Sequence, residues 1–323
     1  MKVLIIGAAG MIGRKLAEHL VSEGALGGKP ITALHLVDVV APETPGDMVT
    51  SETADLSAAR TAEKLVSQRP DVIFHLAAIV SGEAEADFEK GYAINLDGTR
   101  ALFEAIRAAH ETDGYTPRVV FASSIAVFGA PFPDEIPDAF HLTPLTSYGT
   151  QKAISELLLA DYSRKGFFEG IGIRLPTICI RPGKPNKAAS SFFSNILREP
   201  INGQEAVLPV DESVRHWFAS PRAAVGFFVH AATIDLDTVG PRRNLTMPGL
   251  SATVGEEIEA LERMVGPEAV ARIKREPDAT IEGIVAGWAT RFEAKRASDL
   301  GFVAESDFNE IIGVYLEEEA DGS

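Results

Sequence analysis

Three glycines at a fixed spacing near the start of the chain constrain its fold more than any other feature. They follow a short β-branched run, KVLII, as Gly7, Gly10 and Gly13, and they enclose Met11 and Ile12, which begin an amphipathic helical segment. In a strand, turn and helix of this kind, the first glycine permits a tight turn, the second lets a pyrophosphate approach the backbone, and the third lets helix and strand pack closely. The helix N-terminus adds N–H donors and partial positive charge. The pattern therefore predicts a dinucleotide-binding loop.

Strand-like and helical segments alternate in the first part of the chain. Four further β-like runs follow the first one, at 31–38, 71–78, 118–124 and 170–178. Helical segments lie between them, including one over roughly 85–110 and one that begins at about 147. This alternation predicts an α/β fold, a Rossmann-type doubly wound parallel sheet with helices on both faces.

The pattern changes after Ile178. A loop-rich stretch with several prolines follows, and acidic helical segments come later, around 254–274 and 303–316. The expected domains are a nucleotide-binding Rossmann domain in residues 1–178, with a return of the chain at about 215–240, and a smaller C-terminal substrate-binding lobe in residues 179–214 and 241–323.

Asp38 ends the second predicted strand, LHLVD. An acidic side chain at this place can accept hydrogen bonds from both ribose hydroxyls of the adenosine half of a dinucleotide. It also repels a 2′-phosphate, and the following Val39 and Val40 supply no arginine to bind one. The sequence therefore predicts NAD rather than NADP as the cofactor.

A serine pair and a Y-x-x-x-K pattern are the candidates for catalysis and substrate contact. Ser123 and Ser124 end the run at 118–124, and Tyr148 and Lys152 lie four residues apart on one face of the next helix. A phenol with an ordinary pKa of about 10 is a poor base at neutral pH, but a nearby ammonium and an oxidised nicotinamide both favour the phenolate. Tyr148 can then accept a hydroxyl proton while a serine hydroxyl orients the reacting oxygen.

Composition argues against several classes of partner. The 30 basic and 46 acidic residues give a formal net charge of −16, which disfavours nucleic acid. Cys179 is the single cysteine, there is no secretory signal pattern, and no apolar stretch reaches the roughly 18 residues that span a bilayer. The lone histidines His75, His110 and His141 lack metal-ligand spacing. We therefore expect a cytoplasmic protein that binds no metal, membrane or nucleic acid.

Three basic residues, Arg181, Lys184 and Lys187, stand together in this acidic chain just after the fifth predicted strand. A small anionic substrate needs charge-assisted hydrogen bonds to offset the lost hydration of its carboxylate. Arg181 and Lys184 are therefore predicted to bind the substrate. The alternative interpretation is an exposed basic loop.

Taken together, the motifs GAAGMIG and YGTQK resemble those of the extended branch of the short-chain dehydrogenase/reductase superfamily, the NAD-dependent epimerase/dehydratase family. Further segments follow in the order that this branch shows: DVIFHLAA (71–78), NLDGT (95–99), SSIAVFG (123–129), IRLPTI (173–178) and AKRASDLGF (294–302). The resemblance covers nearly the whole chain. It implies NAD as the cofactor and a homodimer formed by the segment 85–110 and the helix that contains Tyr148.

The resemblance also implies roles for individual residues. It makes Ser124, five residues before Gly129, the catalytic hydroxyl beside Tyr148 and Lys152, with Ser123 as a weaker candidate. It directs Arg215, in VRHW, into the substrate cleft. The other cofactor contacts that it implies are Asp55 and Leu56 at the adenine, the strand end Leu76, Ala77 and Ala78, the bracing Asn95, and Pro176, Thr177 and Ile178 beside the nicotinamide.

Departures from the family's patterns narrow the function. Sugar dehydratases place an Asp-Glu pair after the catalytic hydroxyl residue, whereas Ile125 and Ala126 follow Ser124, so dehydration is not expected. The epimerases' N-x-[YF]-G-P segment is replaced by ICIRPGKPNKAASSFF (178–193), which disfavours a nucleotide-sugar site. That run and VRHWFASPRAA (214–224) resemble the D-erythronate dehydrogenases.

The resemblance thus implies an NAD-dependent dehydrogenase that oxidises C2 of a small sugar acid, D-erythronate, to 2-oxo-D-erythronate. Tyr148 would take the hydroxyl proton, and Lys152 would favour the phenolate and hold the nicotinamide ribose. Two alternatives stay open. One is a nucleotide-sugar epimerase that keeps its NAD and returns the hydride to the opposite face, and the other is a catalytically silent nucleotide-binding regulator.

Overall fold

A computed structural model of the protein describes residues 1–43, 46–183 and 189–319, and the chain divides into two units. Unit 1 consists of Met1–Val127, Pro144–Leu175 and Val225–Thr246, and unit 2 of Phe128–Thr143, Pro176–Ala224 and Met247–Ser323. Several bounds differ from the domains expected from the sequence, and Pro176–Ile178 already belong to unit 2. Residues 128–143 belong to unit 2, and the chain returns to unit 1 at Val225–Thr246.

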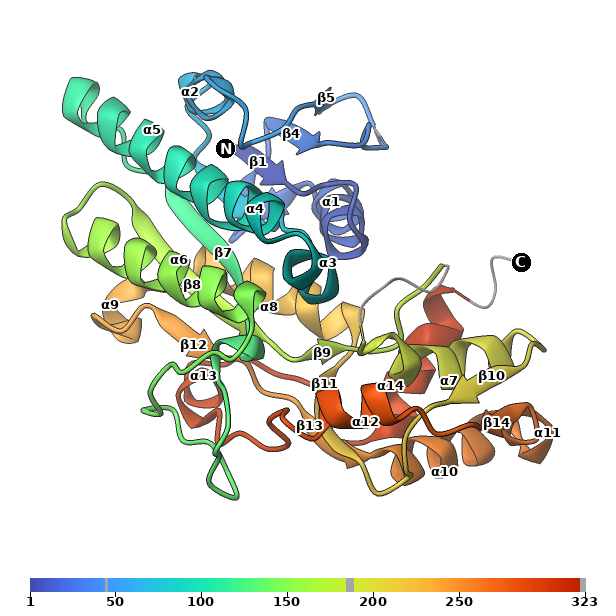
Figure 1. The fold of residues 1–323 in the computed structure, drawn as a ribbon. Coiled ribbons are helices and arrows are strands. Elements are labelled where there is room, and N and C mark those ends of the chain that lie inside the picture. The colour runs from blue at the N-terminus through green and yellow to red at the C-terminus, as the bar shows by residue number, and fades with distance from the viewer. Residues whose placement is uncertain (44–45, 184–188, 320–323) are drawn as a thin grey trace. The chain divides into compact units, whose positions relative to one another are not determined.

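Unit 1 is built on a sheet of seven strands (Figure 1). They are β1 (Lys2–Ile6), β4 (Ala33–Asp38), β5 (Val49–Thr53), β6 (Val72–His75), β7 (Arg118–Ser124), β8 (Glu169–Leu175) and β12 (Asn244–Thr246). Their spatial order is β12-β8-β7-β6-β1-β4-β5, and each neighbouring pair is parallel. The predicted α/β fold with a Rossmann-type parallel sheet is confirmed. The strand order reverses at β1, and ligands of such sheets bind at this switch point, outside the carboxyl ends of the strands.

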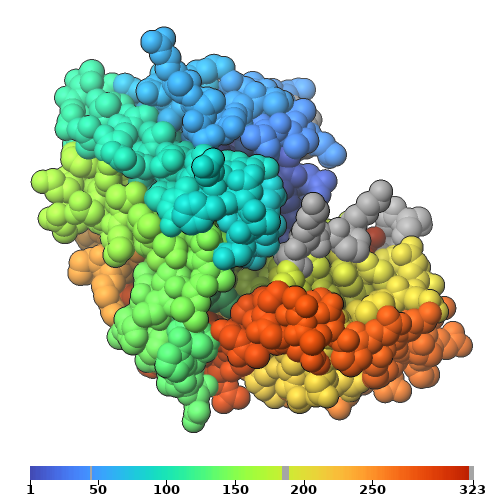
Figure 2. Space-filling model, in the orientation of Figure 1, coloured from blue at the N-terminus to red at the C-terminus, as the bar shows by residue number. Residues whose placement is uncertain are grey.

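Helices cover both faces of this sheet. The long helices are α1 (Met11–Glu23), α5 (Gly98–Asp113), α6 (Ser147–Arg164) and α8 (Pro221–Thr233). The shorter elements are β2 (Ala25–Leu26), β3 (Lys29–Pro30), α2 (Thr61–Ser67), η2 (Ile125–Val127) and α9 (Leu236–Val239). Leu4 and Ile6 join the core that α2, α5 and α6 form. Phe74 of β6 instead packs edge-on against Phe228 of α8, with 6.3 Å between ring centroids. In Figure 2, α5 (teal) and α6 (light green) form part of the visible surface of unit 1.

The segment expected to be one helix over roughly 85–110 is interrupted. It is divided into α3 (Ser81–Ala86), α4 (Phe88–Gly91), a π-helical turn η1 (Tyr92–Asp97) and α5. Asp87 leaves helical geometry at φ −127° and ψ 87°, and its carboxylate accepts the N–H of Lys90 at 3.1 Å, which caps α4. The helical spacing of apolar residues continues across this break, so the sequence pattern does not reveal it.

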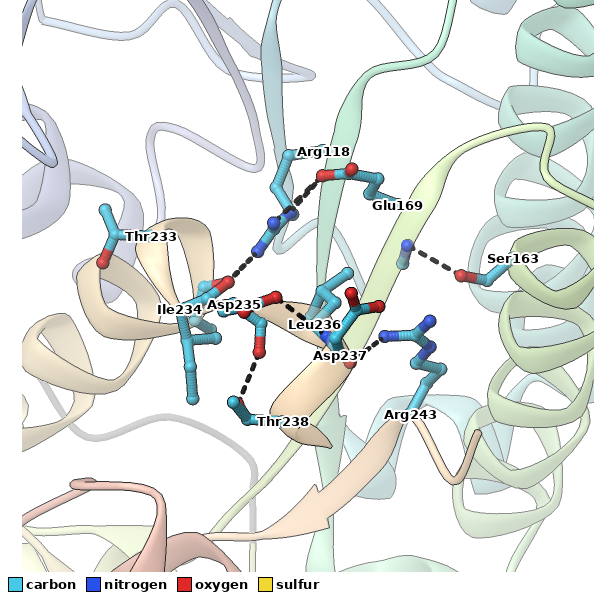
Figure 3. Close-up of polar contacts among 12 residues, drawn as sticks. Arg118, Ser163, Glu169, Thr233, Ile234, Asp235, Leu236, Asp237, Thr238 and Arg243 are labelled. Carbon is cyan, nitrogen blue, oxygen red and sulfur yellow. Dashed lines mark hydrogen bonds and ion pairs between the residues drawn. The ribbon is translucent and has the colours of Figure 1, made fainter. Parts of the chain in front are cut away.

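Arg118 anchors a later part of unit 1 to the amino-terminal edge of the sheet (Figure 3). Its NH1 donates to the carbonyl oxygens of Ala231 and Ile234 at 3.1 and 3.0 Å, and its Nε and NH2 bind the Glu169 carboxylate. Because the strands are parallel, these contacts lie at the edge opposite to Gly7. The carboxyl edge is the one that presents the candidate site.

Unit 2 has its own sheets and its own core. Its strands are β9 (Thr177–Ile178), β10 (Ala206–Leu208), β11 (Arg215–Ala219), β13 (Leu250–Thr253) and β14 (Ile273–Arg275). Its helices are α7 (Ser191–Ile201), α10 (Val254–Val265), α11 (Pro267–Val270), α12 (Ala279–Val285), α13 (Lys295–Asp299) and α14 (Phe308–Glu318). β11 pairs with β9 and β13, and β10 pairs with β14. One core that includes Cys179, Phe193 and Phe218 joins α7, α10 and α14 to these strands.

Candidate active site

The glycine loop between β1 and α1 has no room for a side chain at two of its positions. Gly7 has φ +93°, and a Cβ there would lie 2.5 Å from the backbone nitrogen of Ala77. A Cβ at Gly13 would lie 2.2 Å from the carbonyl oxygen of Gly7. Both distances are far below van der Waals contact. Glycine at these two positions therefore lets the ends of β1 and β6 and the first turn of α1 come together.

The N-terminus of α1 presents its N–H groups at this loop. Gly10 is the N-cap residue, Met11 and Ile12 follow it, and no side chain of the described residues caps the helix. The first N–H groups of a helix lack partners within the helix and carry partial positive charge. A pyrophosphate can accept hydrogen bonds from these N–H groups, and its negative charge complements their partial positive charge. The loop geometry therefore fits the predicted dinucleotide.

Asp38 lies at the end of β4, next to the same loop. Its Oδ2 accepts the N–H of Ala9 at 2.9 Å, and its Oδ1 accepts the N–H of Val40 at 3.3 Å. A carboxylate has about four lone pairs, so two backbone bonds leave acceptor capacity for the hydroxyls of a ribose. The half-buried carboxylate is thus held where the sequence predicts the adenosine ribose.

The strand end after β6 also contacts the loop. The N–H groups of Leu76 and Ala77 both donate to the carbonyl oxygen of Ile6, at 2.8 and 2.9 Å, and Ala78 follows them. These bonds place the predicted strand end beside the end of β1. These three residues are half-buried. They are therefore expected to meet a cofactor with their backbone, at the switch point of the sheet.

Asp55 and Leu56, the predicted adenine contacts, follow β5. Asp55 is exposed, and its Oδ1 accepts hydrogen bonds from the backbone N–H and the hydroxyl of Ser57, at 2.8 and 2.7 Å. The Leu56 side chain is buried in the core of unit 1. Only the Asp55 carboxylate and the backbone of this turn are therefore placed to meet a ligand.

Asn95 uses its side chain to brace the loop after β6. Its Oδ1 accepts the N–H of Ile79 at 2.9 Å, and its Nδ2 donates to the Ile79 carbonyl oxygen at 3.3 Å and to Gln151 Oε1 at 2.8 Å. The amide is buried and both of its donor hydrogens are used, which fits a positioning role better than a direct cofactor contact. Gln151, between Tyr148 and Lys152, was not singled out in the sequence because its partner lies far away along the chain.

Ser124 and Tyr148 come from segments that a glycine brings together. Ser124 ends β7 and its Oγ accepts the N–H of Ala126 at 3.1 Å, while Tyr148 lies in the first turn of α6. A Cβ at Gly149 would lie 2.1 Å from the carbonyl oxygen of Ala126. Gly149 therefore allows α6 to approach the turn after Ser124. Sequence reasoning missed this role, although the glycine follows Tyr148 directly.

Lys152 places a buried ammonium near Tyr148. The side chain is 1% exposed, and its Nζ donates to the carbonyl oxygen of Ala122 at 2.8 Å. Nζ lies 4.7 Å from the ring centroid of Phe121 and 5.7 Å from that of Tyr148. Burial lowers the pKa of Lys152 to about 7, and the Glu156 carboxylate acts in the opposite direction. An ammonium beside a phenol favours the phenolate, so the pair can supply a base.

Ser123, which is predicted to contact the substrate, has its side chain engaged inside the protein. Its buried hydroxyl donates to Glu156 Oε1 at 2.5 Å, and Glu156 also binds Arg174. Because successive residues of a strand point to opposite faces, Ser123 and Ser124 cannot both face one ligand. Ser123 therefore belongs to a buried polar cluster, and Ser124 is the candidate for the reacting oxygen.

The remaining predicted residues of the strand end lie in unit 2. Pro176 and Ile178 are buried, and Thr177 Oγ1 lies 2.7 Å from Nε2 of His216. Burial lowers the pKa of His216 to about 3, so this imidazole is neutral at pH 7. It is a hydrogen-bond partner of Thr177.

The predicted substrate cations are held by their own neighbours. Arg181 donates from Nε to the Ile178 carbonyl oxygen and from NH2 to Ser190 Oγ, each at 3.0 Å. Arg215 donates from NH1 to the Ser251 carbonyl oxygen at 2.9 Å. Both guanidinium groups are half-buried and oriented by these bonds. Lys184 lies outside the described residues.

The described parts of the chain contain neither a metal-binding cluster nor a membrane-spanning helix. Within residues 1–43, 46–183 and 189–319, no three His, Cys, Asp or Glu side chains gather in a way that could hold a metal ion. No helix in the same ranges is long and apolar enough to cross a membrane.

A family model described as the NAD dependent epimerase/dehydratase family matches residues 3–231 of the chain. Two relatives named D-erythronate dehydrogenase align over almost their full lengths. The one from Cupriavidus necator is 46% identical over 323 residues, which cover 98% of each chain. The one from Haemophilus influenzae is 42% identical over 319 residues, which cover 98% of this chain and 99% of the relative.

A solved structure carries a different name. The crystal structure of the nucleoside-diphosphate-sugar epimerase from Agrobacterium tumefaciens is 69% identical to this chain and has a TM-score of 0.98. The match covers 100% of this chain and 95% of the other. The two sets of names therefore point to different reactions on the same fold.

Proposed function

The chain belongs to the NAD-dependent epimerase/dehydratase family, and from this premise we propose that it is an NAD-dependent dehydrogenase of a small sugar acid, D-erythronate. The observation that carries the proposal is its identity of 42–46% to two D-erythronate dehydrogenases over nearly the whole chain. The resemblance to this family that the sequence motifs indicated is confirmed. The proposed reaction converts D-erythronate and NAD⁺ into 2-oxo-D-erythronate, NADH and a proton.

The residues of unit 1 are assigned to binding NAD and to removing the proton of the substrate hydroxyl. The glycine loop and the first turn of α1 would hold the pyrophosphate, and Asp38 the adenosine ribose. Bound NAD supplies the acceptor for the hydride that leaves C2. Tyr148 would take the proton of the C2 hydroxyl, Ser124 would orient that oxygen by a hydrogen bond, and Lys152 would favour the phenolate and bind the nicotinamide ribose. The buried ammonium 5.7 Å from the Tyr148 ring supports this assignment.

We assign the substrate carboxylate to Arg181, with Arg215 as the second candidate. A guanidinium can donate two parallel hydrogen bonds to a carboxylate, and both arginines are already oriented by neighbouring oxygen atoms. Lys184 stays a candidate from the sequence alone. The expected homodimer and cytoplasmic location are also proposals, and the dimer is testable by light scattering of the purified protein.

The second candidate function is a nucleotide-sugar epimerase, which the name of the 69% identical Agrobacterium tumefaciens structure favours. An epimerase keeps its NAD and produces no net NADH. Absence of the N-x-[YF]-G-P segment supports the dehydrogenase instead. The two candidates therefore differ in the net formation of NADH, which is directly measurable.

A substrate screen decides between them. Purified protein is incubated with excess NAD and four- to six-carbon aldonates, and absorbance at 340 nm reports NADH, while UDP-sugars are tested in parallel for conversion to their epimers. We expect NADH formation with D-erythronate and no epimer. Epimer formation without net NADH would support the second candidate. Absence of turnover with every substrate would support the nucleotide-binding regulator.

A further inference from the structure

A row of buried polar side chains crosses three strands of unit 1 and meets α6. Ser123 of β7 and Thr246 of β12 are the register neighbours of Arg174 on β8. Glu156 of α6 receives hydrogen bonds from Arg174 Nε at 2.9 Å and NH2 at 2.8 Å, and from the Ser123 hydroxyl at 2.5 Å. Arg174 NH1 reaches Thr246 Oγ1 at 3.4 Å. All four side chains are buried.

Lys152 lies one helical turn before Glu156 and is buried as well. In their charged forms, Lys152, Arg174 and Glu156 carry two positive charges and one negative charge. Glu156 is the charged group that acts on Lys152 from its own helix, and Tyr148 lies one turn earlier. His75, at the end of β6, is neutral because burial and the Lys152 charge lower its pKa to about 3.

The geometry shows that the Glu156 carboxylate pairs mainly with Arg174. Arg174 donates to both carboxylate oxygens, whereas the Lys152 ammonium donates to the Ala122 carbonyl oxygen. A forked guanidinium contact is the stronger and better oriented of the two kinds of ion pair. The Lys152 ammonium is therefore attracted by the negative charge of Glu156, while its hydrogen bond goes to the Ala122 carbonyl oxygen.

We propose that Arg174 and Glu156 are positioning residues that set the charge of Lys152 through this shared ion pair. Glu156 opposes the loss of charge that burial favours at Lys152. Arg174 limits this attraction so that the ammonium stays available to the cofactor ribose and to Tyr148. This inference rests on the proposed roles of Tyr148 and Lys152. Substitution of either charged partner should therefore change the protonation of Lys152, and the two changes should have opposite signs.

The test follows the affinity for NADH, by its fluorescence, from pH 5.5 to 9.5. Glu156→Gln removes the negative charge that favours the charged form of Lys152, so the loss of NADH affinity should begin at least about one pH unit lower than in the wild type. Arg174→Gln leaves Glu156 to pair with Lys152, so the loss should begin about one pH unit higher. Arg174→Lys keeps the charge without the forked contact and should shift the profile less than Arg174→Gln. Asp161→Asn removes an exposed ion pair on the same helix and should change nothing.

A merely structural role would lower affinity or thermal stability in both Gln variants without moving their profiles in opposite directions. If either single variant fails to fold, the charge-balanced Glu156→Gln/Arg174→Gln variant should fold and lie between the two predicted shifts. Profiles that coincide in all variants, or shift in one direction only, would overturn the proposal. A wild type that binds no NADH at any pH would instead refute the proposed function, on which the inference depends.

Discussion

The carboxylate of Asp38 accepts a hydrogen bond from the backbone N–H of Ala9 at 2.9 Å, which ties the end of β4 to the glycine loop after β1. The bond spans 29 residues of sequence. It fixes the position of a negative charge beside the loop that is proposed to hold the pyrophosphate. Cofactor choice is therefore tested most directly at this residue.

The first prediction is a preference for NAD over NADP that depends on Asp38. Asp38→Asn keeps the shape and removes the charge. Hydrogen bonds to a charged acceptor contribute about 1.5–3 kcal/mol, so NAD affinity should fall about ten- to a hundredfold, while NADP affinity should change little or rise. Fluorescence titration with NADH and NADPH measures both. Equal affinity of the wild type for the two cofactors would contradict the assignment.

The second prediction concerns the space at Gly13. Gly13→Ala adds a Cβ that would lie 2.2 Å from the Gly7 carbonyl oxygen, so the loop must shift and NADH affinity should fall at least about tenfold. Gly226→Ala is the matched control, since it lies in α8 and its Cβ would meet no atom within 4 Å. The control should keep NADH affinity and raise the melting temperature slightly, because alanine favours a helix by about 1 kcal/mol over glycine. Equal NADH affinity in the two variants would refute the close-packing argument.

The third prediction separates the base from its neighbour. Tyr148→Phe removes one oxygen, so turnover of D-erythronate should fall about a hundredfold or more, while NADH affinity is retained. Lys152→Met should lose both turnover and NADH affinity, because Lys152 is assigned two tasks. Steady-state kinetics and fluorescence titration on the same samples measure the two effects. Full turnover in Tyr148→Phe would transfer the role of the base to another group.

Local patterns predicted the parts of the fold whose signals lie in consecutive residues. The run RVVFASS indicated a strand at 118–124, and β7 spans Arg118–Ser124. The helix expected from about 147 is α6, which begins at Ser147. The glycine spacing likewise identified the turn between β1 and α1. In each case the signal lies in neighbouring residues of the sequence.

Contacts between distant residues could not be predicted in this way. The Ser123 hydroxyl bonds to Glu156, 33 residues away, and Asn95 bonds to Gln151, 56 residues away. No local pattern indicates either partner, because each pair meets only after β7, η1 and α6 have packed. For this reason the sequence alone indicates neither the Glu156 partner of Ser123 nor the contact of Gln151 with Asn95.

The fourth prediction concerns stability and a buried carboxyl group in unit 2. Glu257 of α10 is 0% exposed, and neither of its carboxyl oxygens has a hydrogen-bond partner in the described part of the chain. Burial raises its pKa well above the ordinary value. The unfolded carboxyl ionises above about pH 4.3 while the folded one keeps its proton, so the free energy of unfolding falls as pH rises from there toward the folded pKa.

Glu257→Gln imitates the protonated acid, so its free energy of unfolding should not fall in this way as pH rises. Urea unfolding should give equal stability near pH 4 and a variant that gains about 1.4 kcal/mol over the wild type per pH unit within the window. Glu256→Gln is the control of opposite sign, since the Thr253 N–H lowers the Glu256 pKa. Its destabilisation should be present at pH 8 and disappear as pH falls through the folded pKa. A Glu257→Gln variant less stable than the wild type at pH 8 would contradict the argument.

The last prediction identifies the group that binds the substrate carboxylate. Arg181→Leu should raise KM for D-erythronate and lower kcat/KM about ten- to a hundredfold, because a charge-assisted pair contributes about 1.5–3 kcal/mol. NADH affinity should barely change. A packing defect would slow the acid and its uncharged counterpart erythritol alike, whereas loss of a carboxylate contact should reduce the preference for the acid. Arg181→Lys should recover part of this preference, since an ammonium keeps the charge but lacks the forked geometry. Unchanged kinetics in Arg181→Leu together with a lost preference in Arg215→Leu would move the carboxylate contact to Arg215.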